Sequence, residues 1–445
     1  MTTPRYILLI LSLFMVYTQG MWERMLDNTS AIKMIAEVFI WMYLLLSVKY
    51  LKKETPGNII FFVFLLFSMA TSIINGSGLL AWLKYIRYFA YFYLIYITLF
   101  HTTISVNQWG LLLRIIVFLV LIQGLGAIYN VIILGQRVEG YVGLMSSLGG
   151  TTAATFPLLI ISLAVLLYLF NKKQNNKVNL ILLLCVLSAA LVGYSSEKRA
   201  IFFTVPLFLI VIFIFALLHF AKSSAFYKRL GVLVIIILLF LPYYFWGIRK
   251  TAGVNYFLTG NETNIELLEN ALKYATNYEG SLSNEGLTTG RTGSTYQIII
   301  KSTRNVSSFL FGQGYGLIKD ESTTSDLGVM YGIVGLTRDI ISGGWIVMLL
   351  TILIMLKVIL TNRSIKSNMT KAIRILILFV FLFTYLGYSS DFTVSLKINL
   401  IIVFIYVLIN SPIHSEYLEY ISIHYFGEIE REEDVPQYLI NESAS

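Results

Sequence analysis

The 445-residue sequence is poor in charged residues, histidine, proline and cysteine. Only 13% of its residues are charged while 57% are hydrophobic, and it holds 7 prolines, 4 histidines and 1 cysteine. Soluble domains carry about 25% charged residues, so this balance excludes a water-soluble enzyme, a disordered protein and a nucleic-acid-binding protein of the ordinary type. Cys185 lies in an apolar run, which excludes a disulfide framework and a cysteine-based metal site. The composition therefore predicts a membrane protein.

Long apolar runs are what the sequence has in abundance. A helix that crosses a bilayer needs about 20 mostly apolar residues. Runs of this kind occur twelve times, at 6–20, 31–48, 58–75, 79–100, 109–134, 151–170, 178–194, 200–220, 230–247, 339–360, 373–390 and 398–410. We therefore predict an all-α polytopic membrane protein with about twelve transmembrane helices.

The charges of the short loops predict how these helices are oriented. With twelve spans both termini lie on one side of the membrane, and the short loops on that side hold fourteen lysines and arginines. The short loops on the other side hold five, which are Arg24, Arg137, Lys198, Arg199 and Lys397. Because cytoplasmic loops carry the excess of lysine and arginine, we expect both termini in the cytoplasm.

Two polar segments divide the chain into four parts. Spans one to nine occupy 1–247, and spans ten to twelve occupy 327–410. Between them a loop of 79 residues, 248–326, lies on the external face, and the acidic segment 411–445 forms a solvated cytoplasmic tail. Loops longer than about 15 residues are uncommon and are usually functional or disordered. The external loop is therefore the first place to search for a site.

The external loop carries two predicted helices. Apolar residues recur at helical spacing over 264–277, which predicts an amphipathic helix. A second helix is predicted from about Ser294 to Val306, before a glycine-rich stop at 311–316. We expect the loop to form a helical subdomain over the external mouth of the bundle.

The external face has no histidine in the predicted topology. All four histidines fall at the cytoplasmic face or in the tail, so an external site would work without a histidine base. Metal chemistry has little support, because no histidine or cysteine cluster exists and the densest carboxylates, 432–434, lie in the tail. The external residues Asp320, Glu321 and Asp326 come close to a carboxylate group. We therefore expect no metal and no cofactor.

Cations are the distinctive residues of the external face. They follow span five, occupy the tight turn between spans seven and eight, and border the second loop helix. A guanidinium stays charged and matches phosphate oxygens with two parallel N–H donors. The candidates are Arg137, Lys198, Arg199, Arg291, Arg304 and Arg338. The alternative for Arg199 is a surface arginine paired with Glu197, and for Arg291 and Arg304 an ordinary loop cation.

Two further cations lie inside span four. Lys84 and Arg87 share one helical face, and Arg87 is about 12 Å from the external end at 1.5 Å per residue. An ionisable residue at this depth marks a functional site by default. The alternative is that both side chains extend to the surface among aromatic neighbours. With the loop arginines they predict one cationic pocket, open to the outer leaflet, for a lipid-linked diphosphate.

The order of these features resembles the O-antigen polymerase and ligase superfamily, the Wzy-type polymerases and their ligase relatives. The resemblance covers about 135 to 345, while the remaining spans agree in number and hydropathy alone. Its segments are RVEG at 137–140, the small-residue helix start at 149–154, SEKR at 196–199, GR at 290–291, the glycine-rich 311–316, SDL at 325–327 and YGIVGL at 331–336.

The resemblance implies a fold and a set of roles. It implies a GT-C-like helical bundle in the bacterial inner membrane with a periplasmic active site, and a donor diphosphate bound by Arg199, Arg291 and Arg137. Asp326 stands where ligases carry a histidine, so it becomes the first candidate to activate the acceptor, with Glu197 or Glu321 as alternatives.

The expected function is polymerisation of undecaprenyl-diphosphate-linked repeat units in lipopolysaccharide biosynthesis, by metal-independent glycosyl transfer. The expected partners are these lipid-linked glycans and the bilayer, with a chain-length regulator and a flippase as further candidates. Two alternatives stay open. One is an O-antigen ligase, and the other, from a different class, is a lipid-linked oligosaccharide flippase or transporter.

Overall fold

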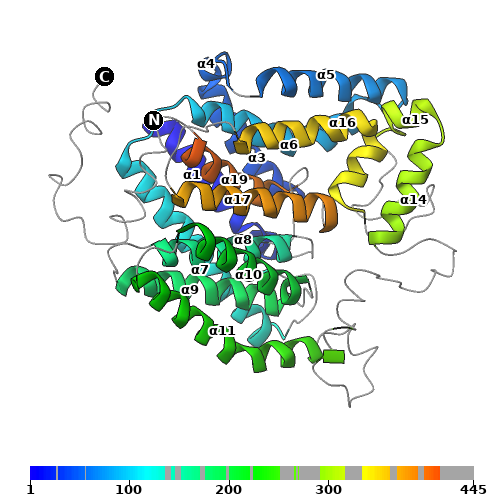
Figure 1. Ribbon diagram of the computed structural model, residues 1–445. Coiled ribbons are helices and arrows are strands. Elements are labelled where there is room, and N and C mark those ends of the chain that lie inside the picture. Colours follow the sequence, from blue (N-terminus) through cyan, green and yellow to red (C-terminus); the bar gives the residue numbers. More distant parts are fainter. Residues whose placement is uncertain are drawn as a thin grey trace.

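The protein is helical throughout the part of the chain that the structure describes (Figure 1). The computed structural model describes residues 1–26, 29–55, 57–135, 142–145, 152–170, 176–196, 200–220, 224–250, 265–266, 269, 291–315, 333–360, 368–388 and 395–410. Its helices are α1 (Thr3–Tyr17), α2 (Gln19–Leu26), α3 (Thr29–Leu46), α4 (Val48–Leu51), α5 (Asn58–Ile74), α6 (Leu79–Phe100), α7 (Val106–Ile132), α8 (Thr152–Phe170), α9 (Asn176–Ser195), α10 (Ala200–Phe220), α11 (Ser224–Lys250), α14 (Arg291–Thr303), α15 (Val306–Phe311), α16 (Gly335–Leu360), α17 (Asn368–Leu382), the π-helix η2 (Phe383–Tyr388) and α19 (Leu396–Asn410).

The twelve apolar runs expected from the sequence all fall in helices. The runs at 79–100 and 200–220 coincide with α6 and α10. Several runs differ in detail. The run at 6–20 is divided between α1 and α2, the run at 31–48 is divided between α3 and α4, and the run at 373–390 changes from α17 to the π-helical η2. The apolar pattern therefore located the helices to within a few residues.

Several helices have the length and composition of membrane spans. Among the described residues, Asn107–Ile132, Asn176–Gly193, Gly335–Leu360 and Thr370–Gly387 are each long and apolar enough to cross a bilayer. The pair α1 and α2, bent by 66°, is a fifth candidate if it counts as one broken span. The protein is thus all-helical and of the membrane type, while twelve crossings remain a prediction.

Helices α1 and α7 lie side by side and run in the same direction. Near their starts the hydroxyl of Tyr6 donates to the carbonyl oxygen of Gln108 over 2.6 Å. At the end of α1 and further along α7, the side-chain amide of Gln123 donates to the carbonyl oxygen of Tyr17 over 2.8 Å. A capping box between Ser105 and Gln108 fixes where α7 begins.

Helices α3 and α6 also run parallel. Glu37 and Arg87, each eight residues into its helix, form an ion pair of 3.5 Å. Further along, the hydroxyls of Tyr43 and Thr98 lie 2.9 Å apart. The contacts advance along both helices together, from Glu37 and Arg87 to Tyr43 and Thr98, so both helices start at the same end of the bundle.

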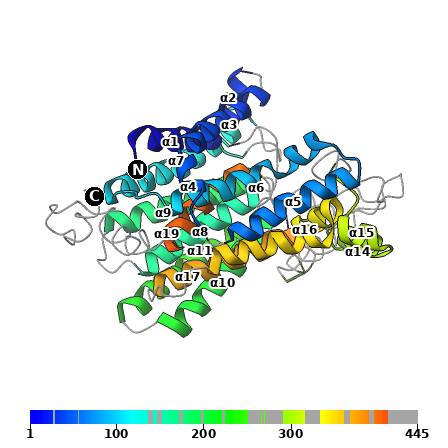
Figure 2. The same cartoon turned by 90° about the horizontal axis from the view of Figure 1, so that it is seen from above.

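The predicted loop 248–326 contains α14 and α15 within the described residues (Figures 1 and 2). The sequence predicted one helix ending near Val306, but the chain breaks at Asn305, whose side chain accepts a hydrogen bond from the backbone N–H of Ser308 over 2.6 Å and so caps α15. The helix predicted over 264–277 lies mostly outside the described residues, of which Ile265, Glu266 and Glu269 are helical.

Helix α15 ends against a break in α16. Gly344 interrupts α16 with φ +81°, and the carbonyl oxygen of Ile341 accepts a hydrogen bond of 2.6 Å from the backbone N–H of Gln313. A Cβ atom on Gly344 would lie 2.2 Å from the carbonyl oxygen of Leu310. Asn75, at the end of α5, donates its side-chain amide to the carbonyl oxygen of Phe311 over 2.9 Å. We call this end of the bundle, where α14 and α15 lie, the loop end.

The break in α16 gives the first prediction. We expect Gly344→Ala to lower the stability of the purified protein by about 1–3 kcal/mol, because the new Cβ meets backbone and the left-handed φ disfavours an L side chain. The matched control is Gly231→Ala in α11, where a Cβ meets nothing within 4 Å. Thermal unfolding in detergent measures both variants, and equal melting temperatures would contradict the proposed constraint.

Candidate functional site

A buried carboxylate lies in the first turns of α16. Asp339 is 1% exposed. Its Oδ1 atom accepts a hydrogen bond from the hydroxyl of Tyr85 on α6, and its Oδ2 atom accepts one of 2.5 Å from the hydroxyl of Tyr385 on η2. A buried charge is tolerated only when its lone pairs are satisfied. This carboxylate therefore joins three helical elements at one point.

The ring of Tyr85 links this carboxylate to a cation. The guanidinium carbon of Arg338 lies 5.3 Å from the centre of the Tyr85 ring, which is a cation–π distance. The ring centre of Tyr315 lies 4.8 Å from that of Tyr85, at an interplanar angle of 59°. We call Asp339, Tyr85, Tyr385, Tyr315 and Arg338 the Asp339 cluster.

Irregular helical backbone lies next to the Asp339 cluster. Tyr385 belongs to the π-helical turn Phe383–Tyr388, and Asp339 lies five residues before the break at Gly344. Single π-helical turns are rare and occur frequently at functional sites. Discontinuous membrane helices form the binding sites of many transporters. We therefore treat the Asp339 cluster as the first candidate site.

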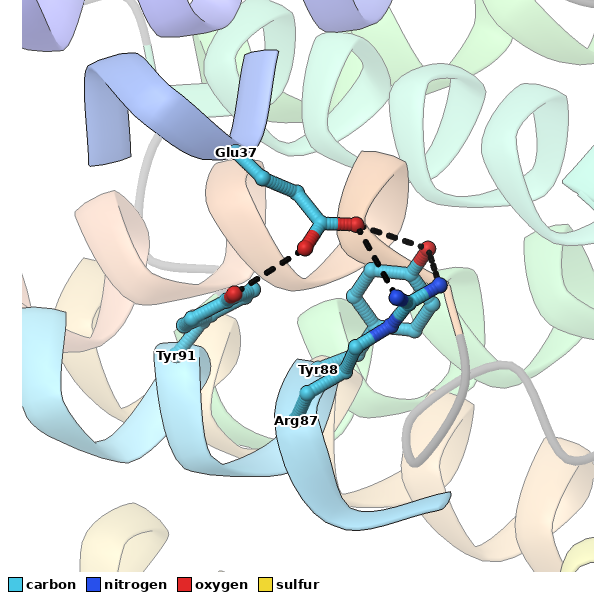
Figure 3. A network of polar contacts seen from close by, with 4 residues as sticks. All are labelled: Glu37, Arg87, Tyr88 and Tyr91. Atoms are coloured by element: carbon cyan, nitrogen blue, oxygen red, sulfur yellow. Dashed lines mark hydrogen bonds and ion pairs between the residues drawn. The ribbon is translucent and has the colours of Figure 1, made fainter. Parts of the chain in front are cut away.

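A second charged centre joins α3 and α6 (Figure 3). Arg87 Nη1 lies 3.5 Å from Glu37 Oε1, and Arg87 Nη2 donates a hydrogen bond of 2.8 Å to the hydroxyl of Tyr88. The hydroxyls of Tyr88 and Tyr91 donate to the two carboxylate oxygens of Glu37 over 3.3 and 3.0 Å. We call these four residues the Glu37–Arg87 network.

The two centres lie on opposite sides of α6. Residues two positions apart on an α-helix point about 200° apart, so Tyr85 faces α16 and η2 while Arg87 faces α3. The sequence placed Arg87 and Arg291 in one pocket. Helix α14, which begins at Arg291, packs on α16, and α16 is the helix that Tyr85 faces. A shared pocket for Arg87 and Arg291 stays a prediction.

The other described site candidates occupy three environments. Arg291 is the first residue of α14 and is partly buried. Arg304 is exposed between α14 and α15, and Lys84 is exposed on α6 one turn before Arg87. Arg338 is partly exposed above the Tyr85 ring.

Six predicted site residues lie outside the described residues. They are Arg137, Glu197, Lys198, Arg199, Glu321 and Asp326. The expected tight turn and most of the expected acceptor site are among them, so these assignments stay predictions. Within the described part of the chain, no three histidine, cysteine, aspartate or glutamate side chains come together as a metal site would require.

Asp339 and Glu37 are absent from the residues selected by sequence. Each is a lone carboxylate within a predicted apolar span, 339–360 or 31–48. The rule that selects Arg87, that an ionisable residue inside a membrane span is functional by default, selects these two acids equally well. Their partners could not be selected in this way, because Tyr85 and Tyr385 are two of 29 tyrosines.

Comparisons of the chain with protein-family models, with curated proteins and with solved structures find no match.

The Asp339 cluster gives the second prediction. We expect Tyr385→Phe to lower the free energy of unfolding by about 1–3 kcal/mol, because it leaves one oxygen of a buried carboxylate without its hydroxyl donor. The matched control is Tyr406→Phe. Tyr406 is equally buried, and its hydroxyl has no hydrogen-bond partner within the described structure.

Titration with sodium dodecyl sulfate in mixed micelles measures both free energies of unfolding. The control is expected to be neutral or slightly more stable, since it removes an unsatisfied polar atom. Equal losses in the two variants would mean that the hydroxyl of Tyr385 contributes no specific hydrogen bond.

Proposed function

We propose that the chain is a glycosyltransferase of the bacterial inner membrane that polymerises undecaprenyl-diphosphate-linked repeat units into O-antigen or a related surface polysaccharide. One observation carries the proposal. The helix that begins at Arg291 packs on the part of α16 that bears Arg338 and Asp339. An arginine-bearing segment of the external loop is thereby held against the bundle, where the diphosphate of a membrane lipid would lie.

The proposed topology has twelve spans in a GT-C-like bundle, cytoplasmic termini and a periplasmic site. In such a topology spans one and five run in the same direction, as do spans two and four. The parallel pairs α1 with α7 and α3 with α6 have the directions that this arrangement requires. The order of motifs between about 135 and 345, which resembles Wzy-type polymerases, is the second support.

The proposed reaction transfers a growing glycan from its carrier to an incoming repeat unit. The bond between the anomeric carbon and the donor diphosphate breaks, and the diphosphate leaves with the electron pair. An acceptor hydroxyl oxygen forms the new bond to that carbon, and its proton passes to a carboxylate. Arg199 and Arg291, assisted by Arg137, would stabilise the leaving anion, and Asp326 would orient or deprotonate the acceptor.

The break in α16 favours a second candidate function. Transporters commonly bind substrate at discontinuous helices near the membrane midplane, and Gly344 interrupts α16 close to a buried carboxylate. A lipid-linked oligosaccharide flippase is therefore the alternative. Movement of a labelled lipid-linked repeat unit across proteoliposomes, with no chain growth, would favour the flippase over the polymerase.

The proposal gives the third prediction. Deleting the gene should reduce the ladder of long surface polysaccharide to a single repeat unit on its lipid anchor. Arg291→Ala, expressed in the deletion strain, should lower polymer by about a hundredfold, since removing one donor that stabilises a developing anion typically costs 10²–10³ in rate. Gel electrophoresis of the extracted polysaccharide measures both.

The control for this experiment is Lys52→Ala, which removes an exposed cation beside α4. It should restore the full ladder at the same membrane abundance as Arg291→Ala. An unchanged ladder in the deletion strain would refute the proposed function. A normal ladder with Arg291→Ala alone would refute only the role assigned to that arginine.

A further inference from the structure

The Glu37–Arg87 network lies at the surface of the bundle. The side chain of Arg87 is 39% exposed and that of Glu37 is 16% exposed. Large apolar side chains surround the network on the same helix faces, among them Met34, which is 66% exposed, and Trp41, which is 51% exposed. The sequence predicts α3 and α6 as membrane spans, and an apolar surface on such a span faces lipid, so a charged pair within it requires an explanation.

Two more cations share this surface. Lys33 lies one turn before Glu37 on α3, and Lys84 lies one turn before Arg87 on α6. Both lysines are exposed. Residues three or four positions apart lie on one face of a helix, so three cations and one carboxylate are gathered along the α3–α6 contact. The excess there is two positive charges, which is the charge complement of a phosphate or diphosphate.

The depth of these side chains matches the level of lipid phosphate groups. Lys33 and Lys84 lie four and five residues from the starts of α3 and α6, which is about 6–8 Å at 1.5 Å per residue. Glu37 and Arg87 lie about 12 Å from the same starts. The polar headgroup layer is about 5–8 Å thick on each side of the hydrocarbon core. With the starts of α3 and α6 placed at the outer edge of this layer, the lysines fall within it and Arg87 lies just below it.

Arg87 is held in place and still has donors to offer. Glu37 and the Tyr88 hydroxyl engage one side of the guanidinium, whose carbon also lies 4.5 Å from the centre of the Tyr88 ring. The Nε atom of Arg87 is buried, but Nη1 and Nη2 each carry a second N–H donor besides the one that these contacts use. A phosphate can therefore bind Arg87 without breaking any of them.

We propose that the α3–α6 face is a lateral binding site for the phosphate group of a lipid, separate from the Asp339 cluster on the other side of α6. Lys33, Lys84 and Arg87 bind the phosphate oxygens, Glu37 orients Arg87, and the acyl or prenyl chain lies along Met34 and Trp41. Two lipids offer this chemistry in the leaflet, a polyprenyl diphosphate carrier and an anionic phospholipid. The site does not depend on the glycosyltransferase activity proposed above.

The test is lipid binding by the full-length protein in detergent, measured by native mass spectrometry. The probes are undecaprenyl diphosphate, phosphatidylglycerol and, as an uncharged reference, diacylglycerol. Lys33→Gln/Lys84→Gln should raise the Kd for the phosphate lipids at least about tenfold, since each basic residue near a lipid phosphate contributes appreciably to binding. Neither lysine takes part in the Glu37–Arg87 network, so the fold should persist.

A second variant addresses Arg87 without leaving an unpaired acid. Glu37→Gln/Arg87→Gln removes both charges together, and it should also weaken binding of phosphate lipids at least about tenfold while thermal unfolding stays cooperative. The matched control, Lys52→Gln/Lys228→Gln, removes two exposed lysines away from this face and should bind lipid as the unmodified chain does.

The outcomes separate the two lipids and the two proposals. Tighter binding of undecaprenyl diphosphate assigns the site to the carrier, and equal binding assigns it to bulk anionic lipid. Diacylglycerol that binds as tightly as phosphatidylglycerol, or a Kd unchanged within about twofold in both double variants, would overturn the site. Because no chain growth is measured, these results hold whether or not Arg291→Ala abolishes polymer.

Discussion

The arrangement of the loop end depends on a close approach of two backbones, where the end of α15 enters the break in α16. Gly312 and Gly344 both have left-handed φ values, and neither position has room for a Cβ atom. The carbonyl oxygen of Ile341, released by the break, accepts the backbone N–H of Gln313. This hydrogen bond gives a carbonyl group of the interrupted helix a partner, so the first turns of α16 can run at an angle to the rest of the helix. In that position Asp339 contacts Tyr85 and Tyr385.

Tyrosine is the residue that makes charge acceptable inside this apolar bundle. Its ring packs among hydrophobic side chains, and its hydroxyl supplies one directional donor. Helix α6 uses this property on two sides, with Tyr85 donating to Asp339 and with Tyr88 and Tyr91 donating to Glu37. Helix α6 therefore contacts α3 through one charged centre and α16 through the other, and the two centres do not touch each other.

The fold was predictable where its cause is local. Apolar runs located the helices, and the glycine-rich stop after Phe311 was correct because a left-handed glycine ends a helix by itself. The break at Gly344 was not predictable, since it depends on the carbonyl of Leu310, more than 30 positions away. The pairing of Arg87 with Glu37 was not predicted for the same reason, because it depends on α3 and α6 running parallel. The sequence selected Arg87 and Lys84 as charges, but it did not identify Glu37 as the partner of Arg87.

The two charged centres on α6 differ in what a ligand can reach. Both oxygens of Asp339 already accept hydrogen bonds inside a closed contact, so a ligand gains access to that carboxylate only if a tyrosine moves. The side chain of Arg87 stays 39% exposed after its contacts with Glu37 and Tyr88 are made. A cation lies beside each carboxylate centre, Arg87 on one side of α6 and Arg338 on the other. Glu37 therefore positions Arg87 by a direct ion pair. Asp339 instead fixes the ring of Tyr85, against which Arg338 lies.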